Sequence, residues 1–133
     1  MVDMVLGDRA VAAEALVGLD AWVEPLGQER LESERYTVPS LFLRSEQWEG
    51  GTNDRFLVPF VERVAGSAGE ASAEIELRQV EGITHAQFST IYMYRPAMQW
   101  IGFLGSADPL AFASEQRRVI REFLQARLQP NPS

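Results

Sequence analysis

Apolar and polar positions along the chain follow two different periods, one typical of strands and one of helices. Three short segments have the pattern of β-strands, at residues 15–19, 40–44 and 73–80. Two longer segments carry apolar side chains at helical spacing, at residues 53–64 and 109–128. Strands that alternate with helices build a parallel sheet with helices on its faces. The pattern therefore predicts an α/β fold with about three parallel strands and flanking helices.

The third predicted strand differs from the first two in its exposure. Residues 15–19 and 40–44 are nearly continuous apolar runs, which is typical of strands buried on both faces. Residues 73–80 alternate strictly between polar and apolar side chains, so one face is expected to contact water, near a sheet edge. Glu74 and Glu76 are predicted to lie on that solvated face.

The remaining segments give weaker signals. Residues 7–14 are alanine-rich and could finish a helix that starts further upstream. Residues 28–36 are predicted to form a charged surface connection, and Thr52 or Asn53 to cap the helix that follows it in the chain. Residues 88–104 are rich in aromatic and methionine side chains, which predicts a core helix. A lipid-facing patch is the alternative interpretation of that last segment.

Composition narrows the range of partners. The net charge of the 133 residues is −7, and all 12 basic residues are arginines that are scattered along the chain, with the Arg117-Arg118 pair on a predicted solvated helix face. This pattern argues against nucleic acid and against polybasic docking on anionic lipid. The chain has no cysteine, which fits a reducing compartment, and no apolar run long enough to span a bilayer. We therefore expect a cytoplasmic protein, and a secreted parent stays open because the true N-terminus can lie upstream.

Two side chains are candidates for catalytic chemistry. Asp20 ends the first predicted strand, just before a loop with proline and glycine, and His85, the single histidine, follows the third strand. An acid and then a histidine at strand ends is the second half of a Ser…Asp…His order. No serine of the chain lies in the Gly-x-Ser-x-Gly context of a nucleophile. Both residues also have simpler interpretations, Asp20 as the cap of a turn and His85 as a surface residue.

Two aromatic residues lie beside these candidates in the sequence. Trp22, two residues after Asp20, either walls a site or packs under its loop, and packing is the commoner fate of a tryptophan. Phe88 follows His85 closely. A metal site would have to be built from carboxylates and the one histidine.

The stretch GLDAWVEPLG at residues 18–27 closely resembles the Leu-Asp-Ala-Trp-x-x-Pro-Leu-Gly segment of platelet-activating factor acetylhydrolases. These are lipoprotein-associated and cytosolic phospholipases with the α/β-hydrolase fold. Residues 39–46 resemble the family's Pro-x-x-Phe-x-x-Ser-Glu strand, and residues 82–88 resemble its histidine loop, with Ala86 where the family has glutamine. Residues 110–128 are similar to its C-terminal helix. The resemblance covers nearly the whole chain from Asp8 onward.

The resemblance implies that residues 1–133 form a single, partial α/β-hydrolase domain, its C-terminal portion. Asp20 would be the triad acid and His85 the triad base, with Trp22 and Phe88 contacting substrate. The nucleophilic serine and the oxyanion hole would lie upstream of Met1. The implied activity is calcium-independent hydrolysis of short or oxidised sn-2 acyl groups of phospholipids, without metal or organic cofactor, and with contact to a membrane or lipoprotein surface. The chain by itself is expected to show little or no turnover.

Two other hypotheses remain open at this point. One is a non-catalytic fragment that binds lipid or pairs its open strand edge with a partner. The other is a different α/β-hydrolase, such as a dienelactone-hydrolase-like esterase. Three strands are few for a stand-alone parallel sheet, which favours a fragment in each case. The sequence does not set the oligomeric state.

Overall fold

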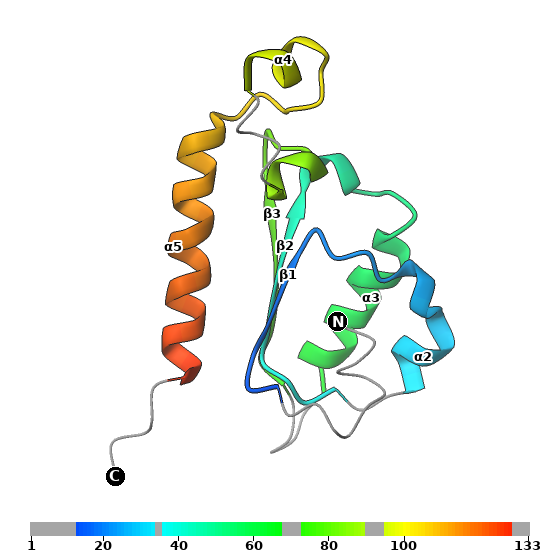
Figure 1. Ribbon diagram of the computed structural model, residues 1–133. Coiled ribbons are helices and arrows are strands. Elements are labelled where there is room, and N and C mark those ends of the chain that lie inside the picture. Colours follow the sequence, from blue (N-terminus) through cyan, green and yellow to red (C-terminus); the bar gives the residue numbers. More distant parts are fainter. Residues whose placement is uncertain (1–12, 34–35, 68–72, 90–94, 129–133) are drawn as a thin grey trace.

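The computed structural model describes residues 13–33, 36–67, 73–89 and 95–128 (Figure 1). Its centre is a parallel sheet of three strands in the order β1-β2-β3. The strands are β1 (Leu16–Leu19), β2 (Ser40–Ser45) and β3 (Ile75–Val80). The predicted three-stranded parallel sheet with flanking helices is therefore confirmed, with strand ends within two residues of those expected.

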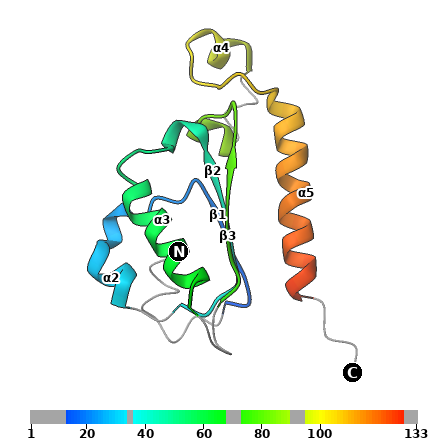
Figure 2. The same ribbon diagram turned by 180° about the vertical axis from the view of Figure 1, so that it is seen from behind.

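Helices cover both faces of the sheet, as the two opposite views show (Figures 1 and 2). The helices α2 (Gln28–Ser33) and α3 (Asp54–Ala65) lie on one face, and the long α5 (Pro109–Leu128) lies on the other. The short α4 (Arg95–Trp100) lies beyond the end of the sheet at which the strands finish. This end carries the loops that follow β1, β2 and β3.

The middle strand β2 joins two apolar clusters, and all six of its residues are buried. Because successive side chains of a strand point to opposite faces, Phe42 packs with Phe60 in the cluster on the α3 side. Leu41 and Leu43 pack with the cluster on the α5 side. Gly18 lies opposite Phe42 in the register, where a Cβ atom would come within 2.5 Å of the phenyl ring. A side chain at position 18 would therefore force the central ring of the core to move.

The predicted amphipathic helices are present. Helix α3 buries its apolar stripe, whereas α5 buries only part of its stripe and leaves Leu110 and Leu128 exposed. In α3 the buried apolar residues follow the helical period: Leu57, Phe60, Val61 and Val64. In α5 the buried positions include Phe112, Val119 and Phe123. Asn53 occupies the N-cap position of α3, but its side chain makes no capping hydrogen bond. The Asn53 side chain instead forms hydrogen bonds with the backbone of the loop after β1.

Among the described residues, β3 lies at one edge of the sheet, as predicted, and its polar side chains are exposed. Glu76 is about half exposed and forms an ion pair with Arg78 on the same strand, while Glu74 pairs with Arg127 of α5. Arg118 likewise lies on an exposed face of α5, where it pairs with Glu115 and Glu122. In the part of the chain that the structure describes, β1 pairs with β2 alone, and it forms the other edge of the sheet.

Two connecting segments differ from their predictions. Residues 28–36 are not only a surface connection, because they contain α2 and bury Leu31 and Tyr36. The Tyr36 ring packs edge-on against Phe60, with 5.2 Å between the ring centroids. A single buried apolar residue is enough to anchor a short helix whose other positions are mostly charged. The high charge of the segment made this helix difficult to predict from the sequence.

The predicted core helix over residues 88–104 is wrong for the residues that the structure describes. Helix α4 has only six residues, and three large apolar side chains near the end of the segment are largely exposed: 92% for Trp100, 59% for Ile101 and 54% for Phe103. Leu104, the last residue of the segment, is buried. Gly102, with φ 72°, ends the helix, and the N–H of Phe103 donates back to the carbonyl of Met98. Residues 90–94 and 7–12 lie outside the described part, so the predictions for them are untested.

Candidate acid–histidine site

Asp20 is positioned by an unusual backbone conformation at the end of β1. Its φ of 47° lies in the left-handed region, which aspartate tolerates better than most residues. Its N–H still donates to the carbonyl of Leu43 on β2, at 2.7 Å. The chain therefore stays attached to the sheet through Asp20 and then turns away, which leaves the side chain at the carboxyl end of β2.

The Asp20 carboxylate is almost fully buried, with 2% of the residue exposed, and it accepts three hydrogen bonds. The backbone N–H of Ser45 donates to Oδ1 at 2.8 Å, and the Ser45 hydroxyl donates to Oδ2 at 2.6 Å. His85 Nδ1 lies 2.9 Å from the same Oδ2. A buried carboxylate requires such donors, because desolvation without partners is costly. The described partners lie on β2 and after β3, so Asp20 links three parts of the chain rather than capping its own turn.

His85 is held at the start of a 3₁₀ helix, η3 (His85–Phe88), just beyond β3. Gln87 holds this loop in place, because its buried Oε1 accepts the backbone N–H of Thr84 at 3.0 Å and the backbone N–H of Gly105 at 2.7 Å. Thr84 and Gln87 together form a capping box. The prediction missed Gln87, although the Thr-x-x-Gln spacing in the sequence is the signal of such a box.

The imidazole of His85 is in contact with the segment that follows β2. The ring of Trp48 stacks on it, with 4.8 Å between centroids and an interplanar angle of 6°. The backbone N–H of His85 donates to Gln47 Oε1 at 3.0 Å. Because the Asp20 carboxylate can only accept, Nδ1 is the nitrogen that carries the proton, and the lone pair is left on Nε2. The side chain is 54% exposed, so this half of the pair is accessible to a reacting group.

A small hollow of about 200 Å³ lies beside the histidine and shares Gln47 and Trp48 with it. Its other lining residues are Trp22, Glu24, Gly51, Thr52 and Asn53. Trp22 is 65% exposed, and its indole N–H donates to Glu24 at 3.2 Å. Of the two alternatives for Trp22, packing under its loop does not fit this exposure, and the side chain lies at the wall of the hollow.

Asn53 secures the loop that carries Trp22. Its Oδ1 accepts the N–H groups of Val23 at 2.8 Å and Glu24 at 3.1 Å, and its Nδ2 donates to the carbonyl of Ala21 at 3.0 Å. The residue predicted as a possible helix cap thus joins the start of α3 to the loop after β1. A separate pair, Arg44 and Asp54 at 2.5 Å, fixes the start of α3 to β2.

Phe88 does not line the hollow. It packs against the cluster on the α5 side of the sheet, and its ring meets Phe112 edge-on at 5.4 Å. The structure thus brings Asp20, His85 and Trp22 to one end of the sheet and places Phe88 in the core. Sequence reasoning also missed the contacts of Ser45, Gln47 and Trp48, for which no local pattern gives a signal.

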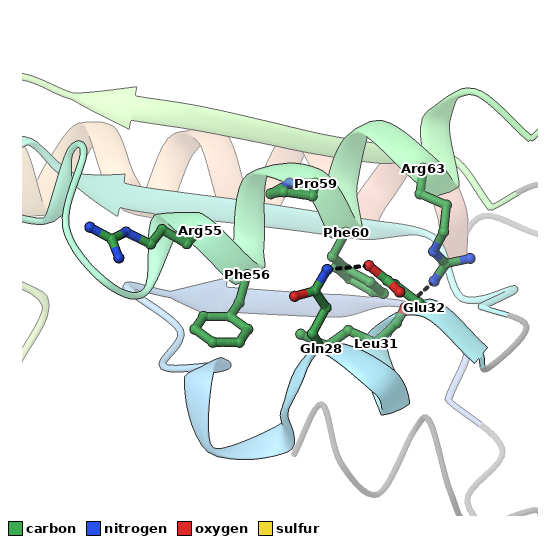
Figure 3. Close-up of a pocket in the computed structure, with 8 residues that line it drawn as sticks. All are labelled: Gln28, Leu31, Glu32, Arg55, Phe56, Pro59, Phe60 and Arg63. Carbon is green, nitrogen blue, oxygen red and sulfur yellow. Dashed lines mark hydrogen bonds between the residues drawn. The ribbon is translucent and has the colours of Figure 1, made fainter.

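A larger hollow of about 360 Å³ lies elsewhere, between α2 and α3, as Figure 3 shows. Its lining residues are Gln28, Leu31, Glu32, Arg55, Phe56, Pro59, Phe60 and Arg63. Two hydrogen bonds are formed among its lining residues. Gln28 donates to Glu32 within α2 at 2.6 Å, and Arg63 of α3 donates to the carbonyl of Leu31 in α2 at 2.5 Å. It contains none of the acid–histidine residues and lies at a joint between helices.

Within the described residues, no group of three or more histidine, cysteine, aspartate or glutamate side chains could hold a metal ion. None of the helices in that part of the chain is long and apolar enough to cross a membrane. Comparisons with protein-family models, curated proteins and solved structures found no match to this chain.

Proposed function

We propose that this chain is the C-terminal part of an α/β-hydrolase-type serine esterase, in which Asp20 is the triad acid and His85 the base. The substrate that we propose is a phospholipid with a short or oxidised sn-2 acyl group, as in platelet-activating factor acetylhydrolases. The observation that carries the proposal is the 2.9 Å contact between Asp20 Oδ2 and His85 Nδ1 at the carboxyl end of a parallel sheet. The resemblance of residues 18–27 supplies the substrate class.

The geometry suits the chemistry of a triad. The carboxylate holds the imidazole in the Nδ1–H tautomer, so that Nε2 can take the proton of a serine hydroxyl as it attacks the ester carbonyl. The protonated ring then gives that proton to the leaving lysophospholipid oxygen. In the deacylation half of the reaction, Nε2 takes a proton from water as the water oxygen attacks the acyl-serine carbonyl. The protonated ring then gives this proton to the serine oxygen as the acyl–serine bond breaks, which releases the acyl group as its acid and restores the serine. In this proposal the serine and the oxyanion hole are supplied by residues upstream of Met1.

The open side of β1 supports this arrangement. A strand edge of unpaired N–H and C=O groups favours pairing with a further strand, and among the described residues β1 has a partner on one side only. A parallel strand added there would finish at the same end of the sheet as β1. A nucleophile at its carboxyl end would therefore lie on the side of the sheet that carries Asp20 and His85.

A fluorophosphonate probe for activated serines tests the proposal. We expect no labelling of the 133-residue chain, and labelling of a longer polypeptide that includes the residues encoded immediately upstream. In the longer polypeptide, His85→Gln should abolish the labelling, whereas Arg117→Gln on the exposed face of α5 should not. Labelling of the short chain, or labelling that is indifferent to His85, would contradict the proposal. A lactone turned over in preference to a short-acyl phospholipid would favour a dienelactone-hydrolase-like esterase instead.

A second candidate function is a non-catalytic fragment that binds lipid. Three large exposed apolar side chains within four consecutive residues, Trp100, Ile101 and Phe103, favour it, because exposed apolar groups that lie close together often mark a binding surface. Co-sedimentation of the chain with phosphatidylcholine liposomes tests this alternative. A monomer that stays in the supernatant would dismiss it.

A further inference from the structure

The imidazole of His85 is fixed by more than its hydrogen bond to Asp20. A half-exposed ring that is bonded at one nitrogen can still pivot about that bond. Here the indole of Trp48 lies parallel to the ring at 4.8 Å, and Gln47 accepts the backbone N–H of the same histidine. The stack fixes the plane of the ring, while the hydrogen bond to Gln47 fixes the backbone from which the His85 side chain extends. Together with Asp20 they leave one direction for Nε2.

The same short segment also holds the carboxylate. Ser45 donates its N–H and its hydroxyl to Asp20. Gln47 and Trp48, in the 3₁₀ turn η2 (Glu46–Trp48), hold His85. Glu46 accepts the N–H of Gly82, in the turn that leads to the histidine loop, at 2.8 Å. Four consecutive residues at the end of β2 thus contact the acid, the histidine and the loop between β3 and the histidine.

We infer that residues 45–48, here called the 45–48 segment, are the positioning element of the acid–histidine pair, and that Trp48 sets the plane of the His85 imidazole. The inference rests on the proposed function for its catalytic meaning, since a fixed Nε2 is what a serine nucleophile needs. Trp48 acts through His85 and is a positioning residue, not a catalytic one. The segment can contact both residues because β2 is the middle strand of the sheet. Asp20 follows the neighbouring strand β1, and His85 follows the other neighbouring strand β3.

The expected size of the effect follows from ring stacking. An aromatic pair of this kind biases its geometry by roughly twofold to tenfold over the unstacked alternatives. Removing the indole should therefore let the imidazole sample other planes, and the ratio of rings bound to Asp20 to rings in other arrangements should fall by a factor in this range. A phenylalanine at position 48 keeps a flat ring and should restore most of the bias.

NMR of the chain tests this directly, because its only histidine gives unambiguous ring signals. In the wild-type protein we expect the His85 ring protons to be shifted upfield by the indole, with cross-peaks to Trp48. In Trp48→Leu the upfield shift should vanish, and the nitrogen spectrum should show a mixture of the two tautomers. Trp48→Phe should keep one tautomer and part of the shift. Trp100→Leu, at a 92% exposed tryptophan, is the control and should change neither.

Two results would overturn the inference. One is a wild-type spectrum without cross-peaks between the rings, which needs no variant to fold. The other is a folded Trp48→Leu protein whose single tautomer is unchanged. Neither readout requires turnover, so the test separates this inference from the proposed function. If the rings behave as expected and no upstream serine is ever labelled, the positioning element stands and the esterase proposal fails.

Discussion

Two segments at the carboxyl end of the sheet are built in opposite ways. The 45–48 segment is polar in composition, yet its contacts extend to Asp20, Gly82 and His85. Residues 95–104, here called the 95–104 segment, are rich in large apolar side chains, yet Trp100 and Phe103 are mostly exposed. The comparison teaches that side-chain polarity does not decide which part of this molecule is fixed. The position in the fold decides it, because a segment at the end of the middle strand has a neighbouring strand on each side. Among the described residues, the 95–104 segment lies beyond the sheet and leaves Trp100 and Phe103 mostly uncovered.

The largest effect should come from removing the carboxylate that the 45–48 segment holds. Asp20→Ala leaves the N–H and hydroxyl of Ser45 buried without their acceptor, so we expect the free energy of unfolding to fall by about 3 kcal/mol. Urea denaturation followed by circular dichroism measures this. Glu29→Ala, at an exposed position of α2, is the control and should stay within about 0.5 kcal/mol of the wild type. Equal losses in both variants would show that the buried Asp20 carboxylate contributes no more to stability than an exposed carboxylate does.

The next effect concerns the loop after β1. Asn53→Ala removes one acceptor shared by two backbone N–H groups and one donor to a carbonyl, so we expect a loss of about 2 kcal/mol in unfolding free energy. Amide hydrogen exchange should also become faster at Val23, which is buried in the wild type. An Asn53→Ala protein with unchanged protection at Val23 would show that other contacts hold this loop. Asn53→Asp, which keeps the acceptor, should lose less.

A smaller effect, visible only in alkali, comes from the charged segment at residues 28–36. Burial raises the pKa of Tyr36 above its ordinary value of 10, and the hydrogen bond with Ser40 opposes this in part. The folded state therefore keeps the phenol neutral at a pH where the unfolded chain ionises it. Stability that is fully present below about pH 10 should decline as the pH rises toward the folded-state pKa. Tyr36→Phe should flatten this part of the stability profile, and an unchanged slope would contradict the burial of the phenol.

The smallest effect on stability is expected in the 95–104 segment. Trp100→Ser and Phe103→Ser each replace a side chain that is more than half exposed, so the free energy of unfolding should change by less than about 0.5 kcal/mol. Thermal unfolding of both variants measures this. A loss of about 2 kcal/mol or more would show that the segment is packed in solution. That result would revive the core helix predicted from the sequence.

The sequence was sufficient for the regular elements because their signals are local. Alternation located β3 and its wet face, and helical spacing located α3 and α5. The strand ends also placed Asp20 and His85 at the same end of the sheet, as the structure does. The burial of Leu31 and Tyr36 was missed because charged neighbours hid a short apolar stripe.

The rest of the site depends on contacts between residues that are distant in the chain. Ser45 meets Asp20, and Asn53 meets the loop at residues 21–24, only because the strands are adjacent in space. The stack of Trp48 on His85 likewise needs the register of β2 against β3. No spacing rule within one segment predicts such pairs. Gln87 is the exception, since its capping box is visible in the sequence.

The central claim is that Asp20 holds His85 in one orientation, and the ring nitrogens of that histidine test it most directly. Long-range proton–nitrogen NMR in alkaline buffer, where an imidazole is neutral, distinguishes the nitrogen that carries the proton from the one with the lone pair. We predict a single tautomer with the proton on Nδ1 in the wild-type chain, and a mixture of tautomers in Asp20→Ala. A wild-type histidine that is mainly protonated on Nε2, or that already shows the mixture, would contradict the account.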